Sequence, residues 1–569
     1  MLSVPALCVH VGLMTRQRRA QALQLAARQQ HVRRSLPGRP GSIYARARRG
    51  YVALAESKQV PSCFADPLLL QDEELAAQAA RVALAVGIDR ATVQEVFQSR
   101  REDRFVWLRR GISPREADAV NALRLPAVGI QYEWCRNYPS AALAATVVGF
   151  RLHDGRGGGG LELSQDRRLA AEDGVQEAVA DASRRPIWPM PEASRPPRDG
   201  CHVFLCMDAV IQEFLQQAVA ESVEQFNAQW GIGVLANPQT GEILAMCSAP
   251  SFDPNTFNEA PADSLANRAI TFPFEPGSAF KPVIAAAAVD AGLVGWQTMI
   301  DCESGVYRAS RGGRISDHGK SFGLLSVADV VVFSSNIGMA KIGEMVGNAQ
   351  LHEMVERFGF GSQTGIELPG ESGGIVLPLS RWNGYSLRRV PFGQEIAVTG
   401  VQLTMAFCSL ANGGLLLRPR LVDYVTDAGG QVVWRSRPVA VRRVLSPQAS
   451  AQMLAVLRDA VERGTGQACR LEAWTSFGKT GTAQVAGVGG YNHDEYTSTF
   501  IGGAPAGDPR IVCLISVYRP DRSKGYYGAK VAAPYVKRVL EKTLRYLEVP
   551  PDKPTGRGGQ RGRLFASAP

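Results

Sequence analysis

Three short motifs in a fixed order constrain this chain more than any other feature of its sequence. They are Ser278-Ala-Phe-Lys281, Ser334-Ser-Asn336 and Lys479-Thr-Gly-Thr482. A serine is inert at its own pKa and needs a base, and in this set the base is a lysine rather than a histidine. The motifs therefore predict a fold that brings three distant segments together around a serine that becomes acylated.

The first motif supplies the candidate nucleophile, Ser278, and its candidate base, Lys281. Pro276-Gly277 reads as a turn into a helix, where residues three apart share a face, so the lysine is expected beside the serine hydroxyl. Lysine acts as a base only when neutral, which requires burial and a nearby cation. The apolar residues 283–288 are expected to bury the amine, and Lys479 is expected to be the cation. Pro282 has no backbone N–H, so it is expected to remove one hydrogen-bond donor from this helix.

Two other interpretations compete with this one. Ser278 is also suited to capping a helix, which would be a structural role without any part in catalysis. A second Ser-x-x-Lys, Ser476-Phe-Gly-Lys479, occurs later, but Gly478 and the residues after it favour a strand, on which serine and lysine would not share a face. Only the Ser278 copy has a helical context.

The second motif places Ser334 and Asn336 after a β-branched apolar run. The functional interpretation puts the Ser334 hydroxyl in a proton relay between lysine and leaving amine, with the Asn336 amide holding a substrate amide. The alternative is that these residues only cap the start of a helix.

The third motif resembles the end of a nucleotide-binding loop, but that loop needs a glycine where Ala473 stands. On a strand beside a cleft, Lys479, Thr480 and Thr482 would instead grip a carboxylate, while Gly481 would let the backbone approach the substrate. The N–H groups of Ser278 and Thr482 would form an oxyanion hole, worth roughly 3–4 kcal/mol per donor.

Composition excludes several other functions. Residues 1–50 hold ten arginines and no acid, while the remaining residues carry 53 basic and 53 acidic groups. The positive charge is therefore terminal, and we expect a segment next to a membrane rather than a nucleic-acid partner. The alternative is a basic terminal segment that has no specific function. The ten cysteines form no C-x-x-C pair, the histidines are dispersed, and neither a metal nor a cofactor is expected.

The pattern along the chain predicts an α+β fold in which an antiparallel sheet is flanked by helices and preceded by a mixed α/β domain. Residues 2–14 are almost wholly apolar but would span only about 20 Å, against about 30 Å of hydrocarbon. We expect the end of a membrane span whose start lies upstream, although a poor signal sequence is the alternative. The predicted divisions are 1–15 partial anchor, 16–35 juxtamembrane helix, 36–190 first domain, 191–200 linker, 201–550 catalytic domain and 551–569 disordered basic tail.

The sequence resembles the class B penicillin-binding proteins, the monofunctional peptidoglycan transpeptidases, over most of residues 16–550. Besides the three motifs, the resemblance rests on the following segments: Asn237-Pro-Gln-Thr-Gly-Glu242, Pro250-Ser-Phe-Asp-Pro-Asn255, Phe274-Glu-Pro-Gly-Ser278, Thr364-Gly-Ile-Glu-Leu-Pro-Gly-Glu371, Phe392-Gly-Gln394, Ala411-Asn-Gly-Gly414 and Tyr526-Tyr-Gly. Tyr138-Pro139, Val148-Gly-Phe150 and Gly160-Leu-Glu162 resemble the family's elongated pedestal domain. Its usual Asp-Arg-x-Gly box is replaced here by Ala45-Arg-Ala-Arg-Arg-Gly50, which lacks the aspartate.

The resemblance implies a transpeptidase domain similar to serine β-lactamases, acting outside the cytoplasm on D-Ala-D-Ala stem peptides and trapped by penicillins. It implies an inner-membrane protein with a single span and a periplasmic catalytic domain. Lys479-Thr-Gly-Thr-Ala-Gln484 and Leu547-Glu-Val-Pro-Pro551 favour the septal type, which would partner a SEDS-family glycosyltransferase and division proteins. An elongation-type enzyme, a β-lactam sensor or β-lactamase-like protein, and an inactive division scaffold are the alternatives.

Overall fold

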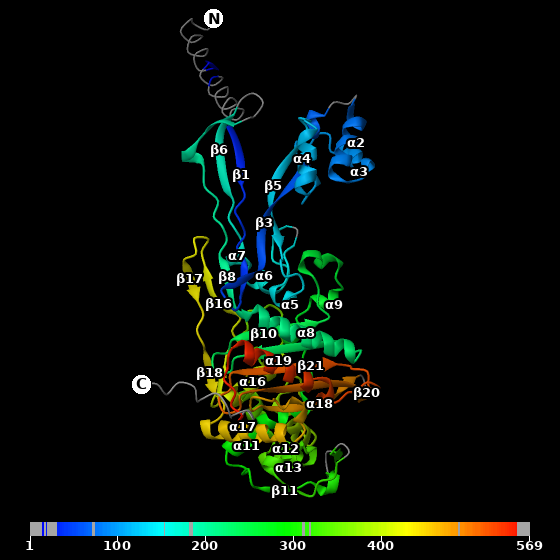
Figure 1. The fold of residues 1–569 in the computed structure, drawn as a ribbon, viewed down its shortest axis with the longest axis vertical. Helices are drawn as coiled ribbons and strands as arrows, with labels where there is room; N and C mark the ends of the chain where they lie inside the picture. Colours follow the sequence, from blue (N-terminus) through cyan, green and yellow to red (C-terminus); the bar gives the residue numbers. More distant parts are fainter. Residues whose placement is uncertain are drawn as a thin grey trace, which may run out of the picture.

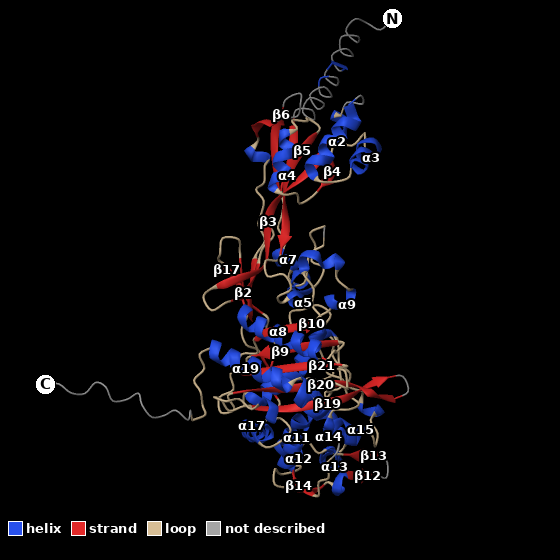
Figure 2. Cartoon of the chain, turned by 45° about the vertical axis from the view of Figure 1, so that its right-hand side comes forward, coloured by secondary structure: helices blue, strands red, loops and turns tan. Residues whose placement is uncertain are grey.

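A computed structural model describes residues 14–15, 19, 31–70, 74–152, 154–180, 186–309, 313–317, 320–487 and 490–554. The molecule is elongated, with a slender amino-terminal pedestal at one end and a larger domain at the other (Figure 1). Figure 2 shows the same division, with the large sheet lying between two groups of helices. The predicted α+β architecture of two domains is confirmed.

The larger domain is built on a five-stranded antiparallel sheet in the order β10-β9-β21-β20-β19. The central strands β9 (Trp230–Ala236) and β21 (Ile511–Tyr518) are apolar and almost fully buried, because helices cover both faces of the sheet. β9 and β10 (Ile243–Ala249) form an antiparallel hairpin around the turn at 237–242. At the opposite edge, β19 (Phe477–Gly487) pairs with β20 (Gly490–Ala504).

One face of this sheet packs against α8 (Ala209–Gln225) and α19 (Ala533–Tyr546). The other face packs against α16 (Gly400–Ala411) and α17 (Pro447–Glu462), and α11 (Lys281–Asp290) contacts both of these helices. α11 is buried along nearly its whole length, which its unbroken run of valine, isoleucine and alanine allows. The core therefore lies directly behind the segment that carries Ser278.

The remaining elements of this domain are short and surround the helical core. The helices are α9 (Ala262–Leu265), α10 (Arg268–Thr271), α12 (Val327–Phe333), α13 (Asn336–Val346), α14 (Asn348–Arg357), α15 (Ser386–Arg389) and α18 (Gly528–Val531). The strands are β11 (Met299–Asp301), β12 (Val306–Arg308), β13 (Arg314–Ser316), β14 (Leu324–Ser326), β15 (Leu415–Leu417), β16 (Val422–Thr426), β17 (Val432–Arg435) and β18 (Ala440–Arg443).

The pedestal has a head in which α2 (Leu75–Val86), α3 (Arg90–Ser99) and α4 (Pro114–Ala122) share a small apolar core with strands. Those strands are β3 (Tyr51–Ala65), β4 (Val106–Arg109) and β5 (Val128–Asn137). Below the head lie α5 (Ala145–Val148), α6 (Gly160–Ser164) and α7 (Asp166–Leu169).

A seven-stranded sheet joins the two domains, so the boundary is less sharp than the sequence suggested. Its order is β17-β16-β8-β2-β3-β4, with β5 also paired to β3. Pedestal strand β2 (Ile43–Arg46) runs parallel to β8 (His202–Asp208), the first strand after the predicted linker. Within the pedestal, the buried Glu162 carboxylate of α6 accepts from Arg136 of β5 at 2.6 Å and from Arg151 at 2.7 Å.

Two predicted divisions are wrong in part. Residues 191–200 are not a free linker, because Arg195 and Arg198 form antiparallel bridges with Val175 and Glu172, alongside β6 (Gly174–Ala180) and β7 (Pro186–Pro189). The predicted helix over 16–35 does not reach its end, because β1 (His31–Leu36) begins at His31 and pairs with β6. Backbone pairing gave these segments hydrogen-bond partners that their composition did not reveal.

Three expectations fall mostly outside the described residues: the anchor over 1–15, most of the juxtamembrane helix, and the tail from 555 onward. Over the ranges that are described, no helix has both the length and the apolar character needed to cross a bilayer.

Candidate active site

The candidate nucleophile lies in a tight turn that leads directly into α11. Residues Gly277–Phe280 form one 3-10 turn, and the α-helix proper starts at Lys281 rather than at Ser278. Gly277 has a φ of 52°, which favours glycine. Pro282 stands in the first turn of α11, where its missing N–H needs no partner, so the cost expected for this proline does not arise.

Lys281 is fully buried, and its amine is held by the second motif. Its Nζ donates to the Ser334 carbonyl oxygen at 2.6 Å, to the Ser334 hydroxyl at 3.2 Å and to Asn336 Oδ1 at 2.8 Å. Burial, followed by the neighbouring Lys479 charge, lowers the pKa of Lys281 well below its usual value. Burial and the neighbouring charge therefore favour the neutral form of the amine, which is the form that a lysine base requires.

Lys479 reaches the same hydroxyl from strand β19. Its Nζ lies 2.9 Å from Ser334 Oγ and 3.3 Å from Thr465 Oγ1. Burial, with a smaller contribution from Lys320, lowers the pKa of Lys479 to about 7. Without substrate, this lysine thus carries only part of a charge at neutral pH, whereas the sequence interpretation treated it as a permanent cation.

Ser334 takes its position from the turn between α12 and α13. It ends α12 with a φ of 67°, in the left-handed region, and this conformation aims its carbonyl and hydroxyl oxygens at the lysines. The neighbouring Ser335 caps α13 by accepting from the Gly338 N–H at 2.9 Å. Both interpretations of the second motif therefore apply, to different residues: Ser335 caps the helix while Ser334 and Asn336 face the site.

Asp317 is a residue of this site that sequence reasoning missed. Its carboxylate accepts from the Ser335 hydroxyl at 2.7 Å and from the N–H groups of Asn336 at 2.6 Å and Ile337 at 3.1 Å. The Asp317 side chain is buried, but its negative charge lies at the positive end of the α13 dipole, and this interaction stabilises the charge. No spacing rule in the sequence indicates an aspartate beside the second motif.

One cavity of about 360 Å³ brings the three motifs together. Its lining includes five predicted residues, Ser278, Ser334, Asn336, Thr480 and Thr482. The other lining residues are Asp317, Lys320, Phe322, Phe333, Thr465, Tyr527 and Ala529. Lys281 and Lys479 are joined to this group through the Ser334 hydroxyl.

Gly481 has a steric role behind the cavity. A Cβ at this position would lie 2.7 Å from the Pro276 carbonyl oxygen and 3.2 Å from the Ala279 Cβ. Strand β19 therefore packs against the turn that carries Ser278 at a distance that only glycine permits. The third motif thus fixes the position of the first one.

One group of potential metal ligands, Cys206, Glu242 and Asp423, lies in the joint between the domains rather than in this cavity. Arg46 donates to Glu242 at 2.9 Å and to Asp423 at 2.7 Å, and Arg420 donates to Glu242 at 2.8 Å. The two guanidinium groups already supply the positive charge that a cation would bring.

The cavity gathers a serine, two buried lysines and a second serine hydroxyl, and comparison with known proteins identifies the family. Residues 231–541 match the model of the penicillin binding protein transpeptidase domain, and residues 35–205 match the penicillin-binding protein dimerisation domain. The chain is 33% identical over 504 residues to the probable peptidoglycan D,D-transpeptidase PbpC of Pseudomonas aeruginosa, covering 88% of this chain and 86% of the relative.

It is also 28% identical over 504 residues to the peptidoglycan D,D-transpeptidase FtsI of Escherichia coli, covering 88% and 82% of the two chains. Among solved structures, it is similar to the apo form of penicillin-binding protein 3 from Mycobacterium tuberculosis, with a TM-score of 0.70 and 28% identity. That similarity covers 92% of this chain and 99% of the other. The chain belongs to the class B penicillin-binding proteins and is a serine-type peptidoglycan D,D-transpeptidase.

Proposed function

We propose that Ser278 is the nucleophile of this transpeptidase and that Lys281 is its base. What supports the assignment is the position of the Ser334 hydroxyl, which accepts from Lys281 at 3.2 Å and from Lys479 at 2.9 Å beside a cavity lined by Ser278. A hydroxyl between two amines whose pKa values are both lowered can pass a proton in either direction.

In the first half-reaction, the Ser278 Oγ bonds to the carbonyl carbon of the penultimate D-alanine, and its proton passes to neutral Lys281. The N–H groups of Ser278 and Thr482 donate to the oxygen that becomes negative. The C–N bond to the terminal D-alanine then breaks, and the leaving nitrogen takes a proton from Lys281 by way of the Ser334 hydroxyl. D-Alanine departs and leaves an ester on Ser278.

In the second half-reaction, an amine from a neighbouring stem peptide attacks the ester carbonyl and loses a proton to the same relay. The C–O bond breaks, and the Ser278 oxygen regains a proton. One amide has been exchanged for another, so the cross-link forms without an external energy source.

Substrate binding is assigned to the third motif and to Asn336. The terminal carboxylate of the stem peptide is held by Lys479, Thr480 and Thr482, and the Asn336 amide holds a peptide group of the substrate. A bound carboxylate raises the pKa of Lys479, so substrate binding itself restores the full charge that burial weakens. Gly481 keeps strand β19 close to the turn that carries Ser278.

A β-lactam would be opened by the same attack on Ser278 and remain bound as a long-lived ester. We further assign the enzyme to septal wall synthesis, in the inner membrane with one span and a periplasmic catalytic domain, beside a SEDS-family glycosyltransferase and division proteins. This assignment rests on the third motif in its longer form, Lys479-Thr-Gly-Thr-Ala-Gln484, and on the similarity to FtsI.

Labelling of the purified protein with fluorescent penicillin tests the nucleophile, with Ser278→Ala set against Ser476→Ala. Ser476 begins the other Ser-x-x-Lys and is buried, with its hydroxyl donating to the Cys469 carbonyl. We expect labelling and D-alanine release to be lost in Ser278→Ala and kept in Ser476→Ala. Labelling that survives in a folded Ser278→Ala variant would place the nucleophile elsewhere. Depletion in cells tests the role: filaments indicate septal synthesis, and rounded cells indicate elongation.

A further inference from the structure

Strand β17 forms an exposed edge of the sheet that joins the two domains. β16 is its one partner strand within the ranges that the structure describes, and β17 lies at the outer rim in both views (Figures 1 and 2). Its apolar residues are exposed, with Val432 46%, Val433 55% and Trp434 37% accessible. An apolar edge strand invites pairing with another strand, and proteins usually protect such an edge with lysine or proline.

The segment that contains β17 is also strongly basic. Residues 431–443 contain Arg435, Arg437, Arg442 and Arg443 and no acidic residue, although the chain beyond residue 50 has equal numbers of basic and acidic groups. The two valines that follow β17, Val439 and Val441, are each 44% exposed. Residues 431–443, here called the basic ribbon, therefore combine apolar side chains with guanidinium groups that suit carboxylates.

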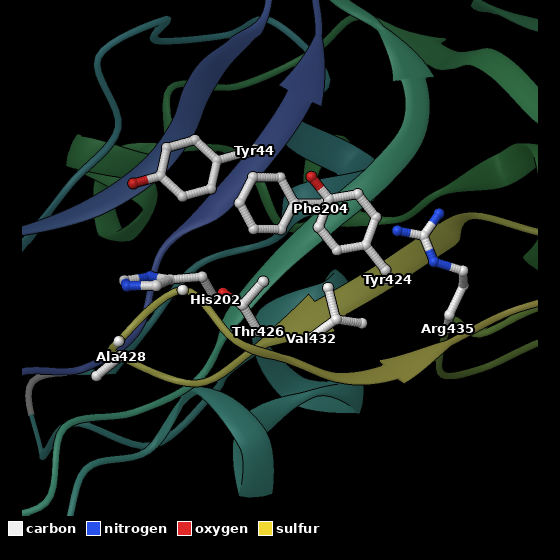
Figure 3. A pocket seen from close by; sticks show the side chains of 10 residues that line it. Tyr44, His202, Phe204, Tyr424, Thr426, Ala428, Val432 and Arg435 are labelled. Carbon is white, nitrogen blue, oxygen red and sulfur yellow. The ribbon is translucent and has the colours of Figure 1, made fainter.

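A cavity of about 480 Å³ opens on the same hairpin, well apart in the fold from the catalytic cavity. Figure 3 shows Tyr44, Phe204 and Tyr424 side by side above it, with Val432 below and Arg435 at one end. The ring of Phe204 stacks on Tyr44 at 4.9 Å and on Tyr424 at 4.4 Å, and the Arg435 guanidinium lies 4.7 Å from the Tyr424 ring. This arrangement is a ready-made surface for an apolar side chain.

Thr426 gives a second, independent indication of a ligand at this cavity. It lines the cavity, is only 5% exposed, and its hydroxyl has no hydrogen-bond partner in the described part of the chain. A buried hydroxyl without a hydrogen-bond partner is unfavourable, and a hydrogen bond with a bound molecule would remove that cost.

We propose that the basic ribbon is a docking site for an extended, acidic segment of a partner protein. The segment pairs as an added strand with the free edge of β17, sets carboxylates against Arg435 and Arg437, and places an apolar side chain in the cavity beneath Tyr44, Phe204 and Tyr424. This interaction surface is separate from the transpeptidase site and does not depend on it.

Two other occupants fit the surface less well. A lipid surface would meet the arginines and valines but would leave the N–H and C=O groups of the strand edge without partners. A second copy of the chain, paired through β17, would bring two sets of arginines together, and like charges at an interface are repelled. An acidic strand would pair with the N–H and C=O groups of the β17 edge, and its carboxylates would neutralise the arginine charges.

A fluorescein-labelled decapeptide of alternating glutamate and valine serves as the probe, with binding to the full chain measured by fluorescence anisotropy. We expect saturable binding that weakens at least tenfold in Val433→Lys and in the double variant Arg435→Glu/Arg437→Glu. The matched controls are Val306→Lys, an exposed valine on another short strand, and Arg115→Glu on α4, and both are expected to bind as the wild type does. Amide hydrogen exchange at 432–435 is expected to slow when the peptide binds.

Several results would overturn the proposal. These are the absence of saturable binding, equal binding of a lysine–valine peptide, and equal binding by the ribbon variants and the controls. Binding of phosphatidylglycerol vesicles that the acidic peptide does not displace would identify a membrane surface instead. A dimer in sedimentation analysis that Val433→Lys dissociates would identify a second copy. Penicillin labelling, measured in parallel, separates any failure here from a failure of the catalytic assignment.

Discussion

Lys281 and Lys479 donate to one shared acceptor, the Ser334 hydroxyl, at 3.2 and 2.9 Å. Two buried ammonium groups on one hydroxyl repel each other, so the protonation of one lysine opposes protonation of the other. The site therefore holds a single mobile proton near neutral pH more readily than two. This relationship is the physical basis for the proposed roles of Lys281 as base and of the Ser334 hydroxyl as relay.

Replacing Lys479 by methionine tests this coupling. Because the Lys479 charge lowers the pKa of Lys281, its removal raises that pKa, and the pH midpoint of acylation by penicillin is expected to move upward. The acylation rate is expected to fall by about 10²-fold or more, as when one charged group is removed from a catalytic site. The measurement is the second-order rate of labelling between pH 5 and 10.

The same variant has a distinct expected effect on stability. Burial lowers the pKa of Lys479 to about 7, so below that pH folding must bury a charged amine, which opposes folding. Lys479→Met is therefore expected to leave the free energy of unfolding unchanged or to raise it, most clearly below pH 7. A large loss of stability would make Lys479 a structural residue and weaken its assignment to substrate binding.

Asp317→Asn is expected to damage both stability and activity. The asparagine keeps the size of the side chain but loses the charge at the start of α13 and faces the Ser335 hydroxyl with altered hydrogen bonding. We expect a loss of about 1–3 kcal/mol in the free energy of unfolding, together with slower acylation because Asn336 is no longer fixed. Chemical denaturation and labelling rates measure the two effects.

Asp329→Asn is the matched control for this change. Asp329 interacts with the Ser326 cap at the start of α12, away from the lining of the catalytic cavity. Its replacement is expected to lower stability while leaving the acylation rate of the folded protein within about twofold. If both variants are acylated equally fast, Asp317 stabilises α13 but does not contribute to acylation.

The sequence predicted what depends on local pattern and missed what depends on distant pairing. Ser278, Lys281, Ser334 and Lys479 could be selected as candidates because motif spacing restricts their chemistry, and the structure brings their three segments together. Asp317 was not identifiable, since its partners at 335–337 become neighbours only through the fold. The parallel pairing of β2 with β8 joins residues about 160 positions apart, and the composition of the two segments does not predict this pairing.

Gly481→Ala tests whether β19 sets the position of the nucleophile. The new Cβ would stand 2.7 Å from the Pro276 carbonyl oxygen, closer than carbon and oxygen approach without a shift. We expect the turn at 276–279 to move and acylation to fall at least tenfold, because small displacements in a catalytic site are costly. Gly507→Ala is the control and is expected to acylate normally, because a Cβ there would have no neighbour within 4 Å among the described residues.

Glu275 gives the protein a second titration, which bears on stability rather than on catalysis. Burial raises the pKa of its carboxyl to about 7, although one oxygen accepts from the Tyr491 hydroxyl at 2.9 Å and from the Glu395 N–H at 3.0 Å. A group whose pKa is higher in the folded protein than in the unfolded chain favours folding while it is protonated. The contribution is complete below about pH 4.5 and is lost as the pH rises through about 7.

Glu275→Gln removes this titration while keeping the shape of the side chain. As the pH rises from 4.5 to 8, the wild type is expected to lose about 2–3 kcal/mol of its free energy of unfolding relative to the variant. Urea denaturation at a series of pH values measures this difference, and taking the difference cancels the titration of all other groups. Glu353→Gln, which changes an exposed carboxylate on α14, is the control and is expected to show no such trend. A flat difference for Glu275→Gln would mean that water reaches its carboxyl and keeps it ionised in the folded protein.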